Sequence, residues 1–147
     1  MVDGIEDFSL EKGQWKATTS KGVRSPLIER KDWYSDAEGK QLQNKVQPLH
    51  GELFAWFGGY KEYIQQEMYL PSVTIPEEAT HLSFFVFIYS NSGAHDALHL
   101  LIDDQVVFYF NGYKEGYGDD YRNMDVDIRK YADGRTHSLM FRHYGVK

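Results

Sequence analysis

The sequence predicts an all-β protein, an antiparallel β-sandwich of about eight to ten strands. Aromatic residues make up 16% of the 147 residues, and their side chains suit the pleated surface of a sheet. Short runs alternate between apolar and polar residues with period two, and turn residues separate the runs at regular intervals. No stretch shows a convincing helical period. We therefore expect one domain over residues 1–147, with an irregular, loop-rich segment at 20–50.

The stretch from 80 to 110 is the most regular part of the chain. It predicts three consecutive strands, with turn residues at 91–93 and at 103–104. The three strands are expected to form one sheet, and one set of alternating side chains is expected in the core: Leu82, Phe84, Val86, Ile88, Leu98, Leu100, Ile102, Val106, Phe108 and Phe110. The opposite set includes Phe85, Phe87, Tyr89, His99, Leu101, Val107 and Tyr109. We expect segment 20–50 to cover Phe85 and Phe87, because large exposed apolar patches are rare on soluble monomers.

The preceding part of the chain predicts shorter strands. Residues 5–10 and 15–19 are typical of two strands around a turn, and a short strand is expected at 26–30. The apolar run at 52–57 predicts a strand that ends at a glycine pair. Residues 63–69 alternate weakly, and Pro71 and Pro76 follow them. Because proline cannot donate a ladder hydrogen bond, we expect this strand at a sheet edge or the prolines at strand ends.

The C-terminal part predicts a turn-rich segment and two further strands. Residues 111–121 combine glycines and tyrosines. The run at 122–128 places Met124, Val126 and Ile128 inward, and the run at 136–143 places Leu139 and Phe141 inward.

Composition excludes several classes of function. The formal net charge of −6 disfavours nucleic-acid binding, which needs a basic face to neutralise phosphates. The chain has no cysteine, which excludes disulfides and thiolate metal sites. No apolar run approaches the roughly 20 residues of a membrane span. The acidic N-terminal residues lack the apolar segment of a signal peptide, so the chain is either cytoplasmic or a processed part of an exported protein.

Four segments in order resemble bacterial jelly-roll accessory modules, such as carbohydrate-binding modules and MAM-like domains. They are GELFAWFGGY at 51–60, VTIPEEATHLSFFVFI at 73–88, HDALHLLIDDQVVF at 95–108 and MDVDIRKYADGRTHSLMF at 124–141. The resemblance implies a jelly-roll sandwich, a non-catalytic binding role and an extracellular or cell-surface location. It also implies a structural Ca²⁺ near the N-terminus. The candidate ligands are carboxylates, which calcium prefers: Asp3, Glu6, Asp7 and Asp96.

The aromatic residues suggest where a carbohydrate would bind. Tyrosine offers a large contact area together with a hydroxyl group that can hydrogen-bond a ligand. The candidates lie on the predicted outer sheet face and in the tyrosine-rich loop: Tyr89, His99, Tyr109, Tyr113, Tyr117 and Tyr121. Arg142 and His143 on the last strand are expected to hydrogen-bond hydroxyl groups of the ligand. The alternative is a protein-protein interaction or assembly module that uses the aromatic face, and the oligomeric state stays open.

A second alternative is a small enzyme built on the same fold. His95, Asp96 and His99 have the spacing of a zinc-protease motif, which needs a helix to bring both histidines to one metal. On a strand, residues four apart are about 13 Å from each other. Because the alternation of neighbouring leucines favours a strand, we expect no metal at these histidines and identify no catalytic residue.

Overall fold

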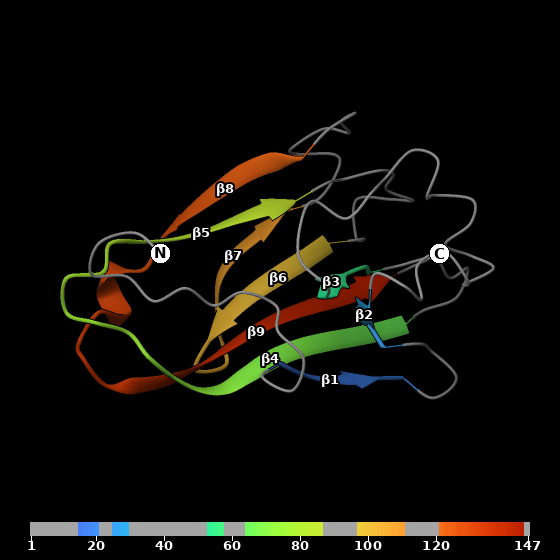
Figure 1. Cartoon of the computed structure of the whole chain (residues 1–147), viewed down its shortest axis with the longest axis horizontal. Helices are drawn as coiled ribbons and strands as arrows, with labels where there is room; N and C mark the ends of the chain where they lie inside the picture. Colours follow the sequence, from blue (N-terminus) through green and yellow to red (C-terminus); the bar gives the residue numbers. More distant parts are fainter. Residues whose placement is uncertain are drawn as a thin grey trace.

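The structure is a computed structural model, and it describes residues 15–20, 25–29, 53–57, 64–86, 97–110 and 121–145. Within these residues the chain forms nine β-strands and one short 3-10 helix (Figure 1). The strands make one five-stranded sheet and two two-stranded sheets. Every strand pair is antiparallel. The prediction of an all-β, antiparallel sandwich is confirmed.

The five-stranded sheet, called the main sheet below, has the order β1-β4-β9-β6-β7. Its strands are β1 (Lys16–Thr19), β4 (Ile64–Thr74), β9 (Thr136–Gly145), β6 (Ala97–Ile102) and β7 (Gln105–Phe110). The last strand in the chain, β9, therefore lies at the centre of the sheet, between β4 and β6. Strands far apart in the sequence become neighbours, and side chains from all five can share one surface.

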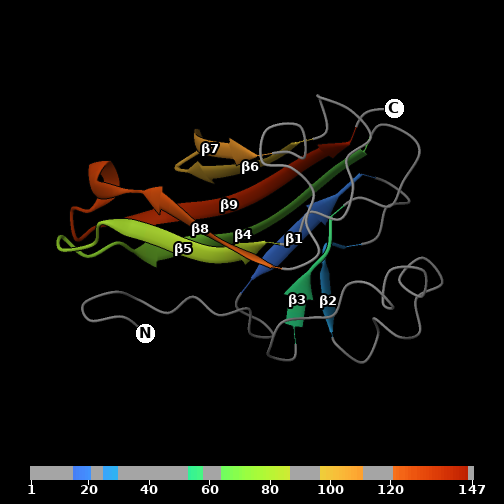
Figure 2. The same cartoon turned by 90° about the horizontal axis from the view of Figure 1, so that it is seen from above.

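The two small sheets lie on one side of the main sheet (Figure 2). One consists of β5 (His81–Val86) and β8 (Arg122–Asp127), and the 3-10 helix η1 (Arg129–Tyr131) follows β8. The other consists of β2 (Leu27–Glu29) and β3 (Leu53–Ala55). The opposite side of the main sheet carries no strand among the described residues.

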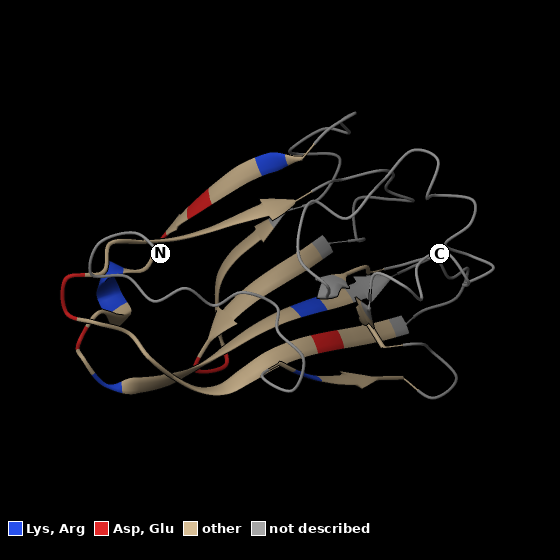
Figure 3. Ribbon diagram, in the orientation of Figure 1, with Lys and Arg blue, Asp and Glu red and all other residues tan. Residues whose placement is uncertain are grey.

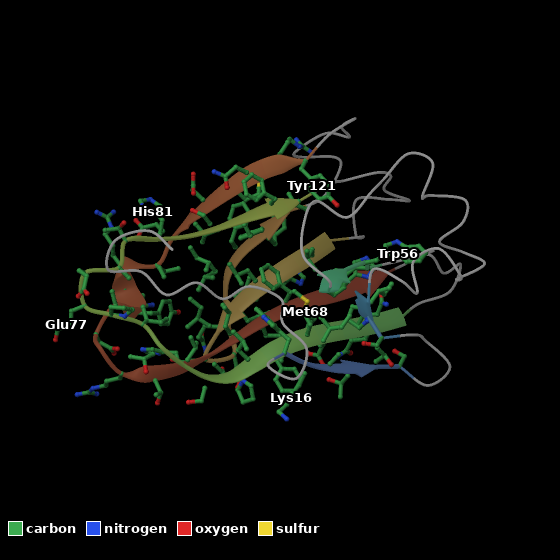
Figure 4. All side chains as sticks on the ribbon, in the orientation of Figure 1. Lys16, Trp56, Met68, Glu77, His81 and Tyr121 are labelled. Carbon is green, nitrogen blue, oxygen red and sulfur yellow. The ribbon has the colours of Figure 1, made fainter. Side chains whose placement is uncertain are left out.

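The core lies between the main sheet and the β5–β8 sheet. Phe84 from β5 meets Phe141 from β9 edge to face, with ring centroids 5.2 Å apart. Met68 points into this interior, whereas Lys16 projects away from it (Figure 4). Most side chains predicted to face inward do so: Leu82, Phe84, Leu98, Leu100, Ile102, Phe108, Val126, Ile128, Leu139 and Phe141. Burying each large aliphatic side chain contributes about 1.5–3 kcal/mol.

The prediction that residues 80–110 form one three-stranded sheet is wrong. β5 pairs with β8, whereas β6 and β7 pair with each other in the main sheet. Leu82 and Phe84 bury themselves against the main sheet, so Phe85 points the other way and is 56% exposed. The expectation that Phe85 is covered is therefore wrong as well, and Phe87 and Tyr89 lie outside the described residues.

The β6–β7 hairpin confirms one prediction and corrects another. Asp103 and Asp104 have φ of 51° and 64°, which a two-residue hairpin turn of type I′ requires at both central positions. A register shift follows between Leu100 and Leu101. This β-bulge turns Val106 outward, where it is 56% exposed, while Val107 packs against the core. The predicted orientations of these two valines are thus reversed.

The prolines after residue 70 do not place their strand at an edge. β4 runs through Pro71 and lies between β1 and β9, so the expectation of an edge strand is wrong, whereas Pro76 lies beyond the end of β4, as expected for a proline at a strand end. The pairing of β4 with β9 shifts between Leu70 and Val73. This irregularity leaves Pro71 outside the paired register, so its missing N–H costs no ladder hydrogen bond. The strands predicted around residues 15–19, 26–30, 122–128 and 136–143 are present, and the one predicted at 5–10 lies outside the described residues.

Candidate functional site

One side chain from each strand of the main sheet stands in a single row on the side away from the core. The pairing places Thr18 opposite Glu67, Glu67 opposite Arg142, Arg142 opposite His99, and His99 opposite Tyr109. Their chain neighbours Met68, Leu100 and Phe141 face the core. Because side chains alternate along a strand, these five face outward. We call them the polar row, and at the usual strand spacing it spans about 19 Å.

An ion pair forms the centre of the polar row. Arg142 Nε donates to Glu67 Oε2 at 2.7 Å, and Arg142 Nη2 also approaches Met140 Sδ at 3.6 Å. Thr18 Oγ1 lies 3.5 Å from Glu67 Oε1. Figure 3 shows this acidic and basic pair side by side on β4 and β9. Apart from Lys16, no other Lys, Arg, Asp or Glu occurs in the strands of the main sheet.

Two rings form the other end of the row. The His99 and Tyr109 rings are tilted by 59°, with centroids 5.9 Å apart, and Tyr109 is 43% exposed. Burial lowers the pKa of His99, and the electrostatic effects of Arg142 and His143 lower it further. His99 is therefore predominantly neutral at pH 7, and a neutral imidazole both donates and accepts hydrogen bonds.

An apolar row runs beside the polar row on the same face. The pairing places Tyr69 opposite Met140, Met140 opposite Leu101, and Leu101 opposite Val106. Leu101 is buried, whereas Val106 at the sheet edge is exposed. Apolar surface on this face therefore comes from the half-buried Tyr69 and Met140 and the exposed Val106, beside the hydrogen-bonding groups of the polar row. This combination suits ligands that have both hydroxyl groups and C–H surfaces.

The structure brings together three of the residues that the sequence predicted for the site. His99, Tyr109 and Arg142 all belong to the polar row. Tyr121 does not, because it precedes β8 in the other layer (Figure 4). His143 is buried and faces the interior, where its ring lies 6.0 Å from Phe57, so its expected contact with a ligand is wrong. The remaining candidates lie outside the described residues: Tyr89, Tyr113, Tyr117, Asp3, Glu6, Asp7 and Asp96.

Sequence reasoning missed two members of the polar row, Thr18 and Glu67. A signal for Glu67 was present, because it is the one Asp, Glu, Lys or Arg within the segment that became β4. A lone acidic residue in a strand calls for a cationic partner on a neighbouring strand. Strand order was needed to identify that partner as Arg142, which is 75 residues away in the sequence.

Of the three residues with zinc-protease spacing, the structure describes only His99, and it does not lie on a helix. His99 lies in the middle of β6. The zinc-protease motif would need His99 on a helix, and this residue is on a strand. His95 and Asp96 lie outside the described residues. Among the residues that the structure describes, no three His, Asp or Glu side chains are placed to hold a metal ion.

Comparisons with known proteins provide no family assignment. The sequence matches no protein-family model and no curated protein. One solved structure, a β-glucuronidase from Ruminococcus gnavus, aligns with a TM-score of 0.36 at 9% identity. The alignment covers 99% of this chain and 23% of the enzyme chain. Separately, no helix among the described residues is long and apolar enough to cross a membrane.

Proposed function

We propose that the protein is a non-catalytic binding module of jelly-roll type that recognises carbohydrate through the polar row. The observation that carries this proposal is the alignment of one side chain from each of the five strands on one face. Tyr109 offers an exposed ring for a sugar face, and His99 and Thr18 offer groups that hydrogen-bond hydroxyls. At about 19 Å, the row is long enough for a short oligosaccharide lying across the strands.

The charges of the row point to a neutral glycan as the ligand. Glu67 and Arg142 form an ion pair, so each charge is compensated within the site. The pKa of His99 is lowered, and this histidine adds no charge at neutral pH. A strongly acidic polysaccharide would have to compete with Glu67 for Arg142, whereas a neutral sugar leaves this ion pair intact.

Affinity electrophoresis in gels that contain neutral or acidic polysaccharides tests the proposal, with glycan-array binding as a second readout. We expect retardation on a neutral polysaccharide. Tyr109→Ala is expected to weaken binding about three- to tenfold, as for the loss of one aromatic stack. Phe85→Ala is the matched control, because Phe85 is an exposed ring on the other layer. Absence of retardation on every polysaccharide, or equal losses in both variants, would contradict the proposal.

A second candidate function is assembly through the edge of the main sheet. β7 is an edge strand without charged residues or proline, whereas natural edges usually carry such protection. Val106 and Tyr109, two of the three exposed large hydrophobic residues among those described, lie on β7. Light scattering after size-exclusion chromatography separates the two functions. Dimers that Val106→Lys dissociates would favour assembly, and a monomer at high concentration would favour glycan binding.

The remaining expectations stay predictions. They concern a structural Ca²⁺ at Asp3, Glu6, Asp7 and Asp96, and an extracellular or cell-surface location. Thermal unfolding measured with and without Ca²⁺ tests the first. A shift of the unfolding temperature with Ca²⁺ that Asp96→Asn removes would support it, because a ligand that binds the folded state stabilises it.

A further inference from the structure

A histidine held between two carboxylates joins the β6–β7 turn to the stretch that enters β9, at the end of the sandwich near η1. His137 Nδ1 lies 2.5 Å from Asp103 Oδ2 in the β6–β7 turn, and His137 Nε2 lies 2.8 Å from Asp133 Oδ1 in the loop before β9. The His137 side chain is 9% exposed. Both ring nitrogens face carboxylate oxygens, which only accept hydrogen bonds, so only the protonated imidazolium donates to both.

Backbone hydrogen bonds tie the same turn to β9. The Asp103 N–H donates to the Ser138 carbonyl at 3.1 Å, and the Ser138 N–H donates to Asp103 Oδ1 at 3.0 Å. Asp103 also has φ of 51°, a left-handed conformation that contacts of this kind hold in place. The turn of the β6–β7 hairpin is thus attached to the start of β9 through one aspartate.

The charged groups around His137 come from the β6–β7 turn, the loop before β9 and η1. The β6–β7 turn supplies Asp103, and the loop before β9 supplies Asp133, whose Oδ1 also accepts from the Arg135 N–H at 3.0 Å. From η1, Tyr131 presents its ring to His137 edge to face at 5.9 Å, and Lys130 Nζ lies 5.8 Å from the centre of that ring. β4 contributes Val73, which pairs with His137 and carries no charge.

We infer that Asp103, His137 and Asp133 form a proton-dependent clamp, which fastens the turn of the β6–β7 hairpin to the start of β9 when His137 is protonated and loosens as it loses its proton. The clamp is defined by its geometry and does not depend on glycan binding. Its consequence for binding does rest on the proposed function: the hairpin carries His99 and Tyr109 of the polar row. Because β6 stays paired with β9 from Ala97 to Ile102, ligand affinity is expected to fall only slightly as the pH rises and the turn of the hairpin loosens.

The shifts in pKa of the three residues determine how the stability of the clamp changes with pH. The Asp103 and Asp133 hydrogen bonds raise the pKa of His137 above its ordinary 6.5. The stabilisation of the fold by His137 is therefore complete below pH 6.5. It is lost as the pH rises through the higher pKa that His137 has in the folded state. The hydrogen bonds from His137 lower the pKa of Asp103 and of Asp133 below 3.8. Their contribution is present above that value and is lost in acid. The clamp is therefore tightest between about pH 4 and pH 6.5.

Two NMR measurements on the unmodified protein test the clamp without any ligand. The first is the titration of the His137 ring, whose midpoint we expect above pH 6.5. The second is hydrogen exchange of the Asp103 and Ser138 amides, corrected for the intrinsic rate at each pH. The opening constant of the turn should rise up to tenfold for each unit by which the pKa of His137 exceeds 6.5. A His137 midpoint at or below 6.5, or protection that is equal at pH 5.5 and 8.5, would overturn the inference.

Three variants distinguish the pH-dependent effect of the clamp from a general loss of stability. His137→Gln removes the titrating group but keeps an amide that donates a hydrogen bond, so protection should become independent of pH. Asp133→Asn should lower the midpoint of His137, because one carboxylate is lost. His81→Gln is the matched control: His81 lies on β5 and contacts Thr80, and its replacement should leave the Asp103 and Ser138 protection profile unchanged. Failure of glycan binding alone would contradict the proposed function and leave the clamp intact.

Discussion

Two histidines in the main sheet have opposite surroundings. His99 in β6 stands beside Arg142 and is partly buried, and both burial and the arginine lower its pKa. His137 in β9 lies between Asp103 and Asp133, and their hydrogen bonds raise its pKa. The surroundings thus favour the neutral form of the imidazole in the polar row and its protonated form in the clamp. Because the two sites share one sheet, their neighbours and not the fold set the charge of each histidine.

The two sites also differ in the parts of the fold that supply their residues. The polar row uses side chains from the middle of strands, where the register fixes their spacing. The clamp uses a turn residue, a loop residue and the first part of β9. A surface made from strand centres is rigid and suits the positioning of a ligand, whereas turns and loops open more readily. We therefore expect changes of pH to act first on the clamp and only through the hairpin on the polar row.

Among the predicted changes in stability, the largest is expected when the ion pair of the polar row is broken. Glu67→Ala leaves the Arg142 guanidinium, whose side chain is 26% exposed, without its 2.7 Å acceptor. Losing a charge-assisted hydrogen bond in a partly buried site should lower the free energy of unfolding by about 2 kcal/mol. Urea denaturation at pH 7 measures this loss.

The double variant Glu67→Gln/Arg142→Met is the control for this prediction. Because it removes both charges together, it leaves no uncompensated group and should recover most of the lost stability. A double variant as unstable as Glu67→Ala would show that the ion pair does not account for the loss.

A smaller and pH-dependent effect is expected at the clamp. His137→Ala removes the donor shared by two carboxylates, and both of these are partly exposed, so solvent screens the interaction. We expect a loss of about 1 kcal/mol in the free energy of unfolding at pH 5.5 and a smaller loss at pH 8.5. His81→Ala serves as the control because His81 lies on β5, outside the clamp. Equal losses for His137→Ala at both pH values would contradict the comparison.

The sequence predicted the fold class and the inward faces because both depend on local alternation. Leu98, Leu100 and Ile102 needed only period two to be placed in the core, and Asp103-Asp104 needed only turn chemistry. The same reasoning failed for Val106 and Val107, because one inserted residue at the bulge reverses the pattern. It also failed for β5, which pairs with β8 in the other layer.

The candidate site was predictable in part. His99, Tyr109 and Arg142 were identified from residue type and outward position, but their alignment depends on β9 lying between β4 and β6. Thr18 and Glu67 join the row through the same long-range pairing. The clamp was not predicted at all, since Asp103, Asp133 and His137 meet only after the hairpin packs against β9. Strand order is a tertiary property, and local periodicity carries no information on it.

The smallest predicted effect tests whether Arg142 contributes to the neutral state of His99. Arg142→Met removes a positive charge beside His99, so the pKa of His99 should rise toward its ordinary 6.5. Because burial is the larger cause, the rise should be incomplete and the pKa should stay below that value. NMR titration of the His99 ring measures the change, with His137 in the same spectrum as an internal control whose midpoint should not move. An unchanged His99 midpoint would show that Arg142 does not contribute to the lowered pKa of His99, which burial and His143 would then account for.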